Sequence, residues 1–435
     1  MAKKVLIITY YWPPAGGPGV QRIVKFTKIL PDFNWQPIIL TVDNPTSPAR
    51  DESLLKDIPK SCKIIKTTTF EPFRIYRYFT GKSKSDTISK NTIIKSPNEK
   101  YSEKISRIIR GNLFLPDARV GWIPAMIKNG LQIIKNEKPA IIFSTSPPHS
   151  LQLGAKNLAK KTGIKWIADF RDPWIEAYWE KEVERINLSN RINRKLEQSI
   201  LKNADIITTV SDGICDLFKK KEDKQYETIF TGMDFVNTDA VKSAYFQIIY
   251  LGNMSKYQSP DTILKAIDQL PNKNKSLVKL LIIGNVYTGH VDRLKGYRSI
   301  HTEIRDFLPR DKMIELAKSA SLLLLINLST VYGKGLMTVK IFDYLSLRKP
   351  ILAIGDKNSS LEQLLIDTRS GRLFSSDEIK NISIFINEKM SEWNNNPAVL
   401  LKDSPLLNKY RTRENVAKLV RLFEQLSEQT ASLKS

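Results

Sequence analysis

Lys340 and Asp343 have the side-chain types and the spacing for chemistry on a charged ligand. They lie in the stretch MTVKIFDYLSLRKPILAIG, which predicts a helix over Thr338–Leu347 followed by a buried strand over Ile351–Ile354. Residues three apart share one face of a helix, and the first turn of a helix attracts anions. A cation there suits phosphates and a carboxylate suits ribose hydroxyls, so the pattern predicts a nucleotide diphosphate site. An ordinary surface ion pair on an amphipathic helix is the alternative.

A turn rich in glycine and proline follows the first predicted strand, in TYYWPPAGGPGVQRIVKF. Gly16, Gly17 and Gly19 would let the backbone approach a ligand closely. A helix begins directly after them and carries Arg22 and Lys25 in its first turns. The turn is not the GxGxxG dinucleotide fingerprint. It predicts a loop that contacts phosphate or sugar, and a merely structural turn is the alternative.

His149 is one of only three histidines, and it closes the segment STSPPH after the predicted strand 140–145. Ligands of open parallel sheets bind beyond the carboxyl ends of the strands. A neutral imidazole at that place could hydrogen-bond a sugar hydroxyl or position a reacting group. A histidine that enters a helix and bonds only to the backbone is the alternative.

The next predicted strand ends in ADFRDPW, where Asp169, Arg171 and Asp172 cluster with Trp174. A sugar site needs acids for the hydroxyls and an aromatic face for the ring, and this cluster provides both. An arginine between two acids could equally be a satisfied ion network that holds the loop.

Two further loops carry candidate binding residues. The segment LFLPDARVGW places Asp117, Arg119 and Trp122 together, either to line a binding site or, for Asp117, to cap a helix. The segment IIYLGNMSKYQSP ends a strand at Gly252 and then offers hydrogen-bond donors and one cation to a diphosphate. These residues are Asn253, Ser255, Lys256 and Gln258, and a plain loop between a strand and a helix is the alternative.

Short apolar strands alternate with helical patterns along the whole sequence, which indicates parallel sheets covered on both faces. At 435 residues the chain is too long for one core. The series restarts near residues 240–244, so we expect an α/β fold of two doubly wound Rossmann-like domains facing a cleft. The expected parts are 1–225, 240–405 and a C-terminal helical segment, 406–435, that packs back toward the first domain. The predicted strands are Val5–Tyr10, Pro37–Val42, Lys63–Thr67, Ala140–Thr145, Lys165–Asp169, Asp205–Val210, Phe246–Leu251, Val278–Ile283, Ser299–Thr302, Leu322–Ile326 and Ile351–Ile354.

The composition is that of a basic globular protein, with a formal net charge of +23. Such a charge attracts polyanions, and residues 74–110 concentrate it among apolar side chains, which predicts a segment on an anionic membrane surface or a solvated loop followed by an amphipathic helix. No zinc-finger spacing or RNA-binding signature is present, which argues against nucleic acid. The two cysteines form no metal-ligand pattern, and no apolar stretch is long enough to span a bilayer. We therefore expect a cytoplasmic protein, either soluble or peripheral on the inner membrane face.

Taken in order along the chain, these pieces resemble a glycosyltransferase of the GT-B fold, close to family 4, the group 1 glycosyltransferases. The matching segments are YYWPPAGGPGVQR, SPPHS, ADFRDPW, NADIITTVSDG, IFTGMD, YLGNMS, LLIIG and KIFDYLSLRKPIL, and they cover nearly the whole chain. The resemblance implies transfer of a sugar from a nucleotide-sugar to a saccharide or lipid-linked saccharide acceptor in cell-surface polysaccharide biosynthesis. It also implies retention at the anomeric carbon, no essential metal and no cofactor.

The resemblance also assigns roles. Asp343 falls on the carboxylate that holds the ribose, and Lys340 falls on a phosphate-binding lysine. Asn253 and Gln258 stand where related sequences carry arginine and lysine, and Gly335 stands where they carry a glutamate. The expected set is catalytic His149 and Asp172; donor-binding Gly17, Gly19, Asn253, Lys256, Met337, Thr338, Lys340 and Asp343; acceptor-binding Arg22, Asp117, Arg119, Trp122, Arg171 and Trp174; and no metal ligand.

Three other functions compete with this interpretation. An epimerase of nucleotide-sugars on the same fold would need further acid and base carboxylates and no acceptor site. A catalytically inactive binding or scaffold protein is consistent with the missing glutamate and arginine. A nucleic-acid binder would show affinity for DNA or RNA that falls steeply with salt.

Overall fold

The computed structural model describes residues 2–45, 47, 50–69, 108, 111–177, 180, 183–236, 243–306, 308–327, 337–397, 400–401 and 404–432. The chain divides into two compact units. Unit 1 contains Met1–Phe230 and Asn415–Ser435, and unit 2 contains Thr231–Glu414. The basic segment predicted at 74–110 lies outside the described residues except for Ile108.

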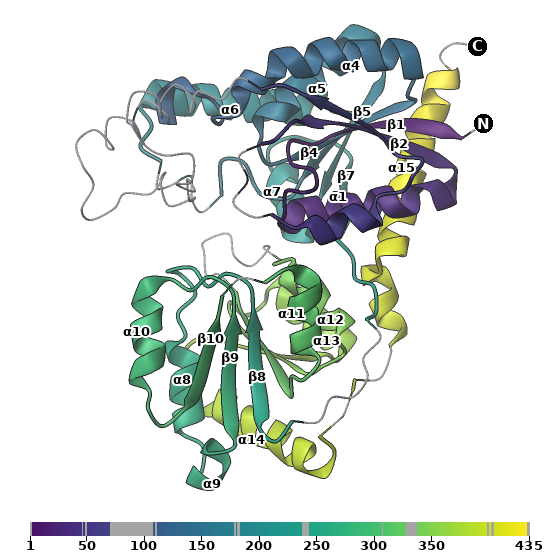
Figure 1. Cartoon of the computed structure of the whole chain (residues 1–435). Helices are drawn as coiled ribbons and strands as arrows, with labels where there is room; N and C mark the ends of the chain where they lie inside the picture. Colours follow the sequence, from purple (N-terminus) through teal and green to yellow (C-terminus); the bar gives the residue numbers. More distant parts are fainter. Residues whose placement is uncertain are drawn as a thin grey trace. The chain divides into compact units, whose positions relative to one another are not determined.

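Unit 1 is built on a parallel sheet whose described strands follow the order β3-β2-β1-β4-β5-β6-β7 (Figure 1). Its strand order reverses between β1 and β4. The strands are β1 (Lys3–Ile8), β2 (Trp35–Val42), β3 (Lys63–Thr67), β4 (Ile141–Ser146), β5 (Lys165–Phe170), β6 (Ile206–Thr209) and β7 (Tyr226–Thr228).

Helices cover both faces of this sheet. Side chains alternate along each strand, and the set that includes Val5 and Ile7 packs with α1 and α15. The other face meets α4 and α5. The helices of unit 1 are α1 (Pro18–Ile29), α4 (Ile123–Glu137), α5 (Ser150–Thr162), α6 (Asn187–Asn203), α7 (Asp212–Lys219) and α15 (Thr412–Ser432), whose last residues, from Asn415 on, belong to this unit. The 3-10 turns are η1 (Leu30–Phe33), η2 (Glu52–Asp57) and η4 (Val120–Trp122).

Unit 2 repeats the design with a second parallel sheet, in the order β10-β9-β8-β11-β12-β13. The order reverses between β8 and β11. The strands are β8 (Phe246–Leu251), β9 (Val278–Ile283), β10 (His301–Arg305), β11 (Leu322–Ile326), β12 (Ile351–Ile354) and β13 (Gly371–Phe374). The helical segments are α8 (Asp261–Asp268), α9 (Asn272–Lys275), α10 (Thr288–Gly296), α11 (Arg310–Ala317), α12 (Lys340–Ser346), α13 (Ser360–Thr368), α14 (Ile379–Asn395) and η7 (Pro405–Tyr410).

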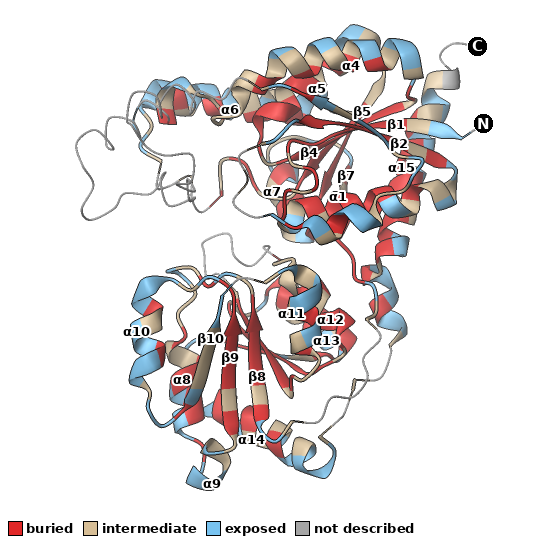
Figure 2. Ribbon diagram, in the orientation of Figure 1, coloured by how far each residue is buried: buried red, intermediate tan, exposed pale blue. Residues whose placement is uncertain are grey.

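The predicted fold class of two doubly wound Rossmann-like α/β domains is confirmed by these sheets. The strands could be recognised in the sequence because most residues of the central strands are buried and therefore apolar (Figure 2). Two strands were not predicted, β7 and β13, and each lies at an edge of its sheet. Both are short, and an edge strand pairs on one side only, so their sequences YET and GRLF carry little apolar signal.

Several predicted boundaries are wrong, among them the first strand, which was predicted at Val5–Tyr10 and lies at Lys3–Ile8. The helix expected from Thr338 begins at Lys340, and the strand expected at Ser299 begins at His301. Met337 and Thr338 therefore precede α12 instead of opening it. Among the described residues, no helix has the length and apolar character required to cross a membrane.

Candidate functional site

The Lys340 ammonium lies at the point in unit 2 where the strand order reverses, at the carboxyl end of β8. Its Nζ donates to the Tyr250 hydroxyl at 2.6 Å and to the Asn253 carbonyl at 3.0 Å, and it lies 4.2 Å from the centre of the Tyr250 ring. Burial lowers the pKa of Lys340 to about 7. An anionic ligand near this half-buried lysine would favour its charged form.

Two glycines make room for this lysine. Gly252 follows β8 with φ +86°, and a Cβ there would lie 2.9 Å from Lys340 Cε. Gly284 follows β9 with φ +138°, and a Cβ on it would lie 2.6 Å from the Gly252 backbone. Any other residue at either position would push the two strand ends apart or displace the Lys340 side chain.

Asp343 has a partner that sequence reasoning missed. Its Oδ1 accepts hydrogen bonds from Arg310 Nε at 3.0 Å and from Arg310 Nη2 at 2.5 Å. Arg310 is the first residue of α11, and both side chains keep about a quarter of their surface exposed, 26% for Arg310 and 21% for Asp343. The structure therefore fixes the Asp343 carboxylate by a charged contact at the start of α12.

The loop after β8 is held mainly by Gln258. Its Oε1 accepts from the Ser255 amide and hydroxyl, and its Nε2 donates to the carbonyl of Ile326 at the end of β11. Asn253 and Lys256 are exposed on this loop, with Lys256 Nζ 4.7 Å from the Tyr257 ring centre. The loop thus leaves Asn253 and Lys256 accessible, while the Gln258 amide joins the two strands at the sheet reversal.

The other residues predicted beside Lys340 lie just before α12. Met337 is buried and Thr338 is half-buried. Gly335, expected at the position of the missing glutamate, lies outside the described residues. Within those residues, no group of three or more His, Cys, Asp or Glu side chains is placed to hold a metal ion.

In unit 1 the glycine-rich loop lies against Arg171. Gly17 is the N-cap of α1 with φ +108°, and a Cβ on Gly19 would lie 2.7 Å from Arg171 Nε. The Arg171 guanidinium also donates to Thr145 Oγ1 at 2.6 Å and to the Pro147 carbonyl at 2.5 Å. It thereby joins the loops that follow β1, β4 and β5. Burial lowers the pKa of Arg171, against the neighbouring charges of Asp169 and Asp172, which raise it.

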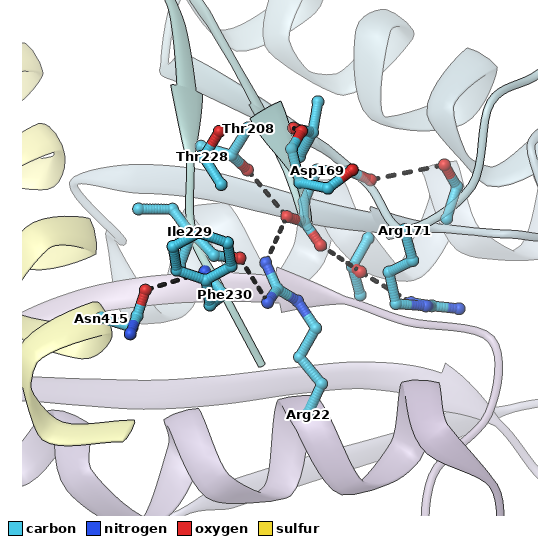
Figure 3. Close-up of polar contacts among 12 residues, drawn as sticks. Arg22, Asp169, Arg171, Thr208, Thr228, Ile229, Phe230 and Asn415 are labelled. Carbon is cyan, nitrogen blue, oxygen red and sulfur yellow. Dashed lines mark hydrogen bonds and ion pairs between the residues drawn. The ribbon is translucent and has the colours of Figure 1, made fainter. Parts of the chain in front are cut away.

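A buried ion pair lies beneath that loop cluster (Figure 3). Arg22 Nη2 donates to Asp169 Oδ1 at 2.8 Å, and Arg22 Nη1 donates to the Ile229 carbonyl at 2.7 Å. Asp169 also accepts from Thr208 Oγ1 at 2.8 Å and from Thr145 Oγ1 at 2.6 Å. Both charged side chains are almost completely buried, at 1% and 0% exposure. Arg22 was predicted to contact the acceptor. Its side chain is instead buried and hydrogen-bonded inside unit 1, so it offers no exposed surface to an acceptor.

His149 lies at the start of α5 and is buried, with 8% of its surface exposed. Its ring stacks on Trp174 at 4.8 Å, and its Nδ1 lies 3.2 Å from Ser146 Oγ. Burial and, to a smaller extent, the charge of Arg171 together lower the pKa of His149 to about 3, against a raising effect of the Pro173 carbonyl. The imidazole is therefore neutral at physiological pH, the protonation state assumed for a histidine that hydrogen-bonds a sugar hydroxyl.

The remaining predicted residues of unit 1 make contacts within the unit. The Asp117 carboxylate accepts from the Ser150 amide at 2.8 Å and from the Ser150 hydroxyl at 2.7 Å, which stabilises the N-terminus of α5. Arg119 lies over the Tyr10 ring, 5.3 Å from its centre. Three further positions complete the set: Trp122, buried with Nε1 bonded to Thr67; Trp174, buried with Nε1 bonded to Asn193; and Asp172, which is half-buried.

No protein-family model matches the sequence, and no curated protein matches it. Solved structures do match along nearly the whole chain. Sucrose-phosphate synthase from Thermosynechococcus elongatus aligns with TM-score 0.55 and 12% identity over 99% of this chain and 98% of that one. Anabaena HepE, in complex with UDP-glucose, aligns with TM-score 0.55 and 11% identity over 99% and 100%.

A third match is WaaG, a glycosyltransferase involved in lipopolysaccharide biosynthesis, with TM-score 0.51 and 13% identity over 99% of each chain. The chain has the GT-B fold. These matches confirm the predicted fold. Because the sequence identities are low, they show the fold alone, and membership of family 4 stays a prediction. In this GT-B chain, Lys340 and Asp343 belong to unit 2, and the Arg171 cluster belongs to unit 1.

The low pKa of Lys340 predicts that binding of an anionic ligand weakens as pH rises. An anion favours the ammonium form, so the ligand-bound lysine holds its proton to higher pH than the free lysine, whose pKa is about 7. Affinity for an anion whose own charge does not titrate near neutrality should fall between pH 7 and pH 9, by at most about tenfold per pH unit. Calorimetric titrations across this range measure the effect. A flat profile in the wild type, or the same slope in Lys340→Met, would contradict it.

Proposed function

We propose that this protein is a glycosyltransferase that moves a sugar from a nucleotide-sugar donor to a saccharide or lipid-linked saccharide acceptor. The observation that carries the proposal is the half-buried Lys340 ammonium at the strand reversal of unit 2, held by Tyr250 and Asn253, one helical turn before the Asp343 carboxylate that Arg310 fixes. Open α/β sheets bind ligands at such a reversal. The presence of UDP-glucose in HepE, which shares the fold, supports a nucleotide-sugar as the ligand.

The proposed donor site uses the two charges separately. Lys340, together with the exposed Lys256 and Asn253, contacts the diphosphate, and Asp343 accepts hydrogen bonds from the ribose hydroxyls. In the transfer step the bond between the anomeric carbon and the phosphate oxygen breaks, and its electron pair stays on that oxygen. The acceptor's hydroxyl oxygen bonds to the anomeric carbon on the same face, and its proton passes to the departing phosphate oxygen. Lys340 stabilises the charge that develops there. We further propose retention at the anomeric carbon and a reaction without a metal, as the family resemblance implies.

In unit 1 we propose that the loop at Gly17 and Gly19, with Arg171 and Asp172, contacts the sugar or the acceptor. The neutral imidazole of His149 would orient a hydroxyl there by a hydrogen bond. Trp122 and Trp174 are left out of this set because both rings are buried and their indole N–H groups already donate within unit 1. An acceptor contact by either ring would require the core to open.

A thermal-shift panel tests the proposal directly. UDP-, GDP- and ADP-sugars are added to the wild type, to Lys340→Ala and to Asp343→Ala, and transfer of a radiolabelled sugar from the best donor is then measured. We expect one nucleotide class to stabilise the wild type and neither variant, and to be consumed only when acceptor is present. Equal stabilisation of all three proteins, or steep salt-dependent binding of DNA or RNA in place of any donor, would refute it.

Arg310 should act on the donor through Asp343. Arg310→Ala removes both hydrogen bonds to Oδ1, and we expect the donor KM to rise about tenfold with a smaller change in kcat, because a charged hydrogen bond that orients the ribose carboxylate is lost. Steady-state kinetics measure the change. In an Asp343→Ala background the same substitution should add little, and an undiminished effect there would show that Arg310 acts independently of Asp343.

A further inference from the structure

Exposed aliphatic side chains gather on two neighbouring segments of unit 1. Leu188 is 62% exposed and Ile192 is 40% exposed, one turn apart on the N-terminal half of α6, and Ile186, just before the helix, is 58% exposed. Leu113 is 72% exposed and Ile108 is 37% exposed on the second segment. Isolated exposed aliphatic residues are ordinary, but a group of five in two short segments is not.

Hydrogen bonds hold the two segments side by side. The Asn112 side chain donates to the Glu184 carbonyl at 3.0 Å and accepts from the Ile186 amide at 2.8 Å. Arg185 Nε donates to the Gly111 carbonyl at 3.0 Å. These bonds join residues 111–112 to residues 184–186, so the segments that carry the exposed aliphatic side chains are neighbours. We call these five side chains the α6 patch: Ile108, Leu113, Ile186, Leu188 and Ile192.

Basic side chains border the α6 patch. Arg191, Arg194 and Lys195 are all exposed on α6, and residues 186–196 contain no acid. Among the described residues, the exposed acid closest in sequence is Glu184, two residues before Ile186. An aliphatic surface with a cationic border matches an anionic lipid bilayer, whose acyl region accepts the aliphatic side chains and whose headgroups attract the cations.

We propose that the α6 patch docks the protein on an anionic lipid surface. None of its residues contributes to the donor site of unit 2, so the proposal stands or falls separately from the proposed transfer reaction. Docking by this face would hold the enzyme against a lipid-linked acceptor in the same bilayer. The charge also makes the attachment reversible by salt, because exposed charges are screened within about 10 Å at 0.1 M ionic strength.

Co-sedimentation of the full chain with vesicles tests the docking surface. Vesicles of phosphatidylcholine alone are compared with vesicles containing about 30% phosphatidylglycerol. We expect binding to the anionic vesicles only, reduced by salt, and reduced at least about tenfold in Leu188→Ser/Ile192→Ser. Replacing Arg191, Arg194 and Lys195 by glutamine should remove the dependence on salt and most of the binding.

A matched control uses exposed aliphatic residues of unit 2. Ile366→Ser/Leu406→Ser removes side chains that are 61% and 54% exposed, and it should bind vesicles as the wild type does. Both double variants should unfold at the wild-type temperature and keep their stabilisation by the nucleotide-sugar, which separates lipid docking from donor binding. The proposal is overturned if Leu188→Ser/Ile192→Ser sediments with anionic vesicles like the wild type, if neutral vesicles bind equally well, or if the variant changes only the oligomeric state in size-exclusion chromatography.

Discussion

Replacing Lys340 with methionine should abolish donor-induced stabilisation and lower kcat/KM by about 10²–10³-fold, the effect of removing one preorganised charge from a site where negative charge develops. The same substitution should leave the thermal stability of unit 2 unchanged or raised. Methionine keeps the aliphatic volume beside Gly252 while the cost of burying an ammonium disappears. The Tyr250 hydroxyl keeps a partner, since it also donates to the Asn253 carbonyl at 2.9 Å.

The two effects together distinguish the possible roles of Lys340. Replacing a structural lysine lowers stability, whereas replacing a ligand-binding lysine lowers affinity and leaves stability unchanged or raised. Lys312→Met is the matched control, because it removes the same charge from an exposed position on the neighbouring helix α11 and should change neither quantity. Calorimetry with and without the donor measures stability and binding together. Loss of activity with a lower unfolding temperature in Lys340→Met would point to a structural role.

Replacing Asp169 with alanine should destabilise unit 1 by about 3–5 kcal/mol, because Arg22 is then left as a buried charge without its counterion. Thr145 and Thr208 lose their acceptor in the same step. Six of the seven tryptophans lie before residue 231, so urea unfolding followed by tryptophan fluorescence reports mainly on unit 1.

Two further variants isolate the ion pair. Thr208→Val removes one neutral donor to Asp169 and should cost about 1 kcal/mol. Arg22→Met/Asp169→Leu removes both charges and should cost less than the sum of the single substitutions, since neither charge is then left unpaired. If Asp169→Ala unfolded within about 1 kcal/mol of the wild type, the pair would not be the main support of the loops after β1, β4 and β5.

The alternation of apolar strands and helices was enough to predict both sheets from sequence. The central strands are buried on both faces, so most of their residues are apolar, and Phe246–Leu251, Val278–Ile283 and Leu322–Ile326 were predicted to the residue. The edge strands β7 and β13 lack that constraint and were missed. The start of α12 was misplaced by two residues because Thr338 and Val339 suit either a turn or a first helical turn.

Only part of the candidate site could be predicted from the sequence. Lys340 and Asp343 could be proposed from a local spacing, since a helix brings residues three apart together whatever surrounds it. Their partners could not be proposed in this way. Tyr250 is 90 residues away from Lys340 and Arg310 is 33 residues away from Asp343, and only the order of the strands decides that these side chains meet.

The burial of charged side chains could not be predicted from the sequence. Arg22 and Asp169 each read as a candidate binding residue, and only packing shows that they neutralise each other inside unit 1. The sequence by itself therefore determined the two-sheet α/β fold and the position of one charged pair, because both follow from periodicity along the chain. The tertiary structure decided which charges are satisfied internally and which lysine is desolvated, because hydration and ion pairing depend on neighbours that the chain brings together only when it folds.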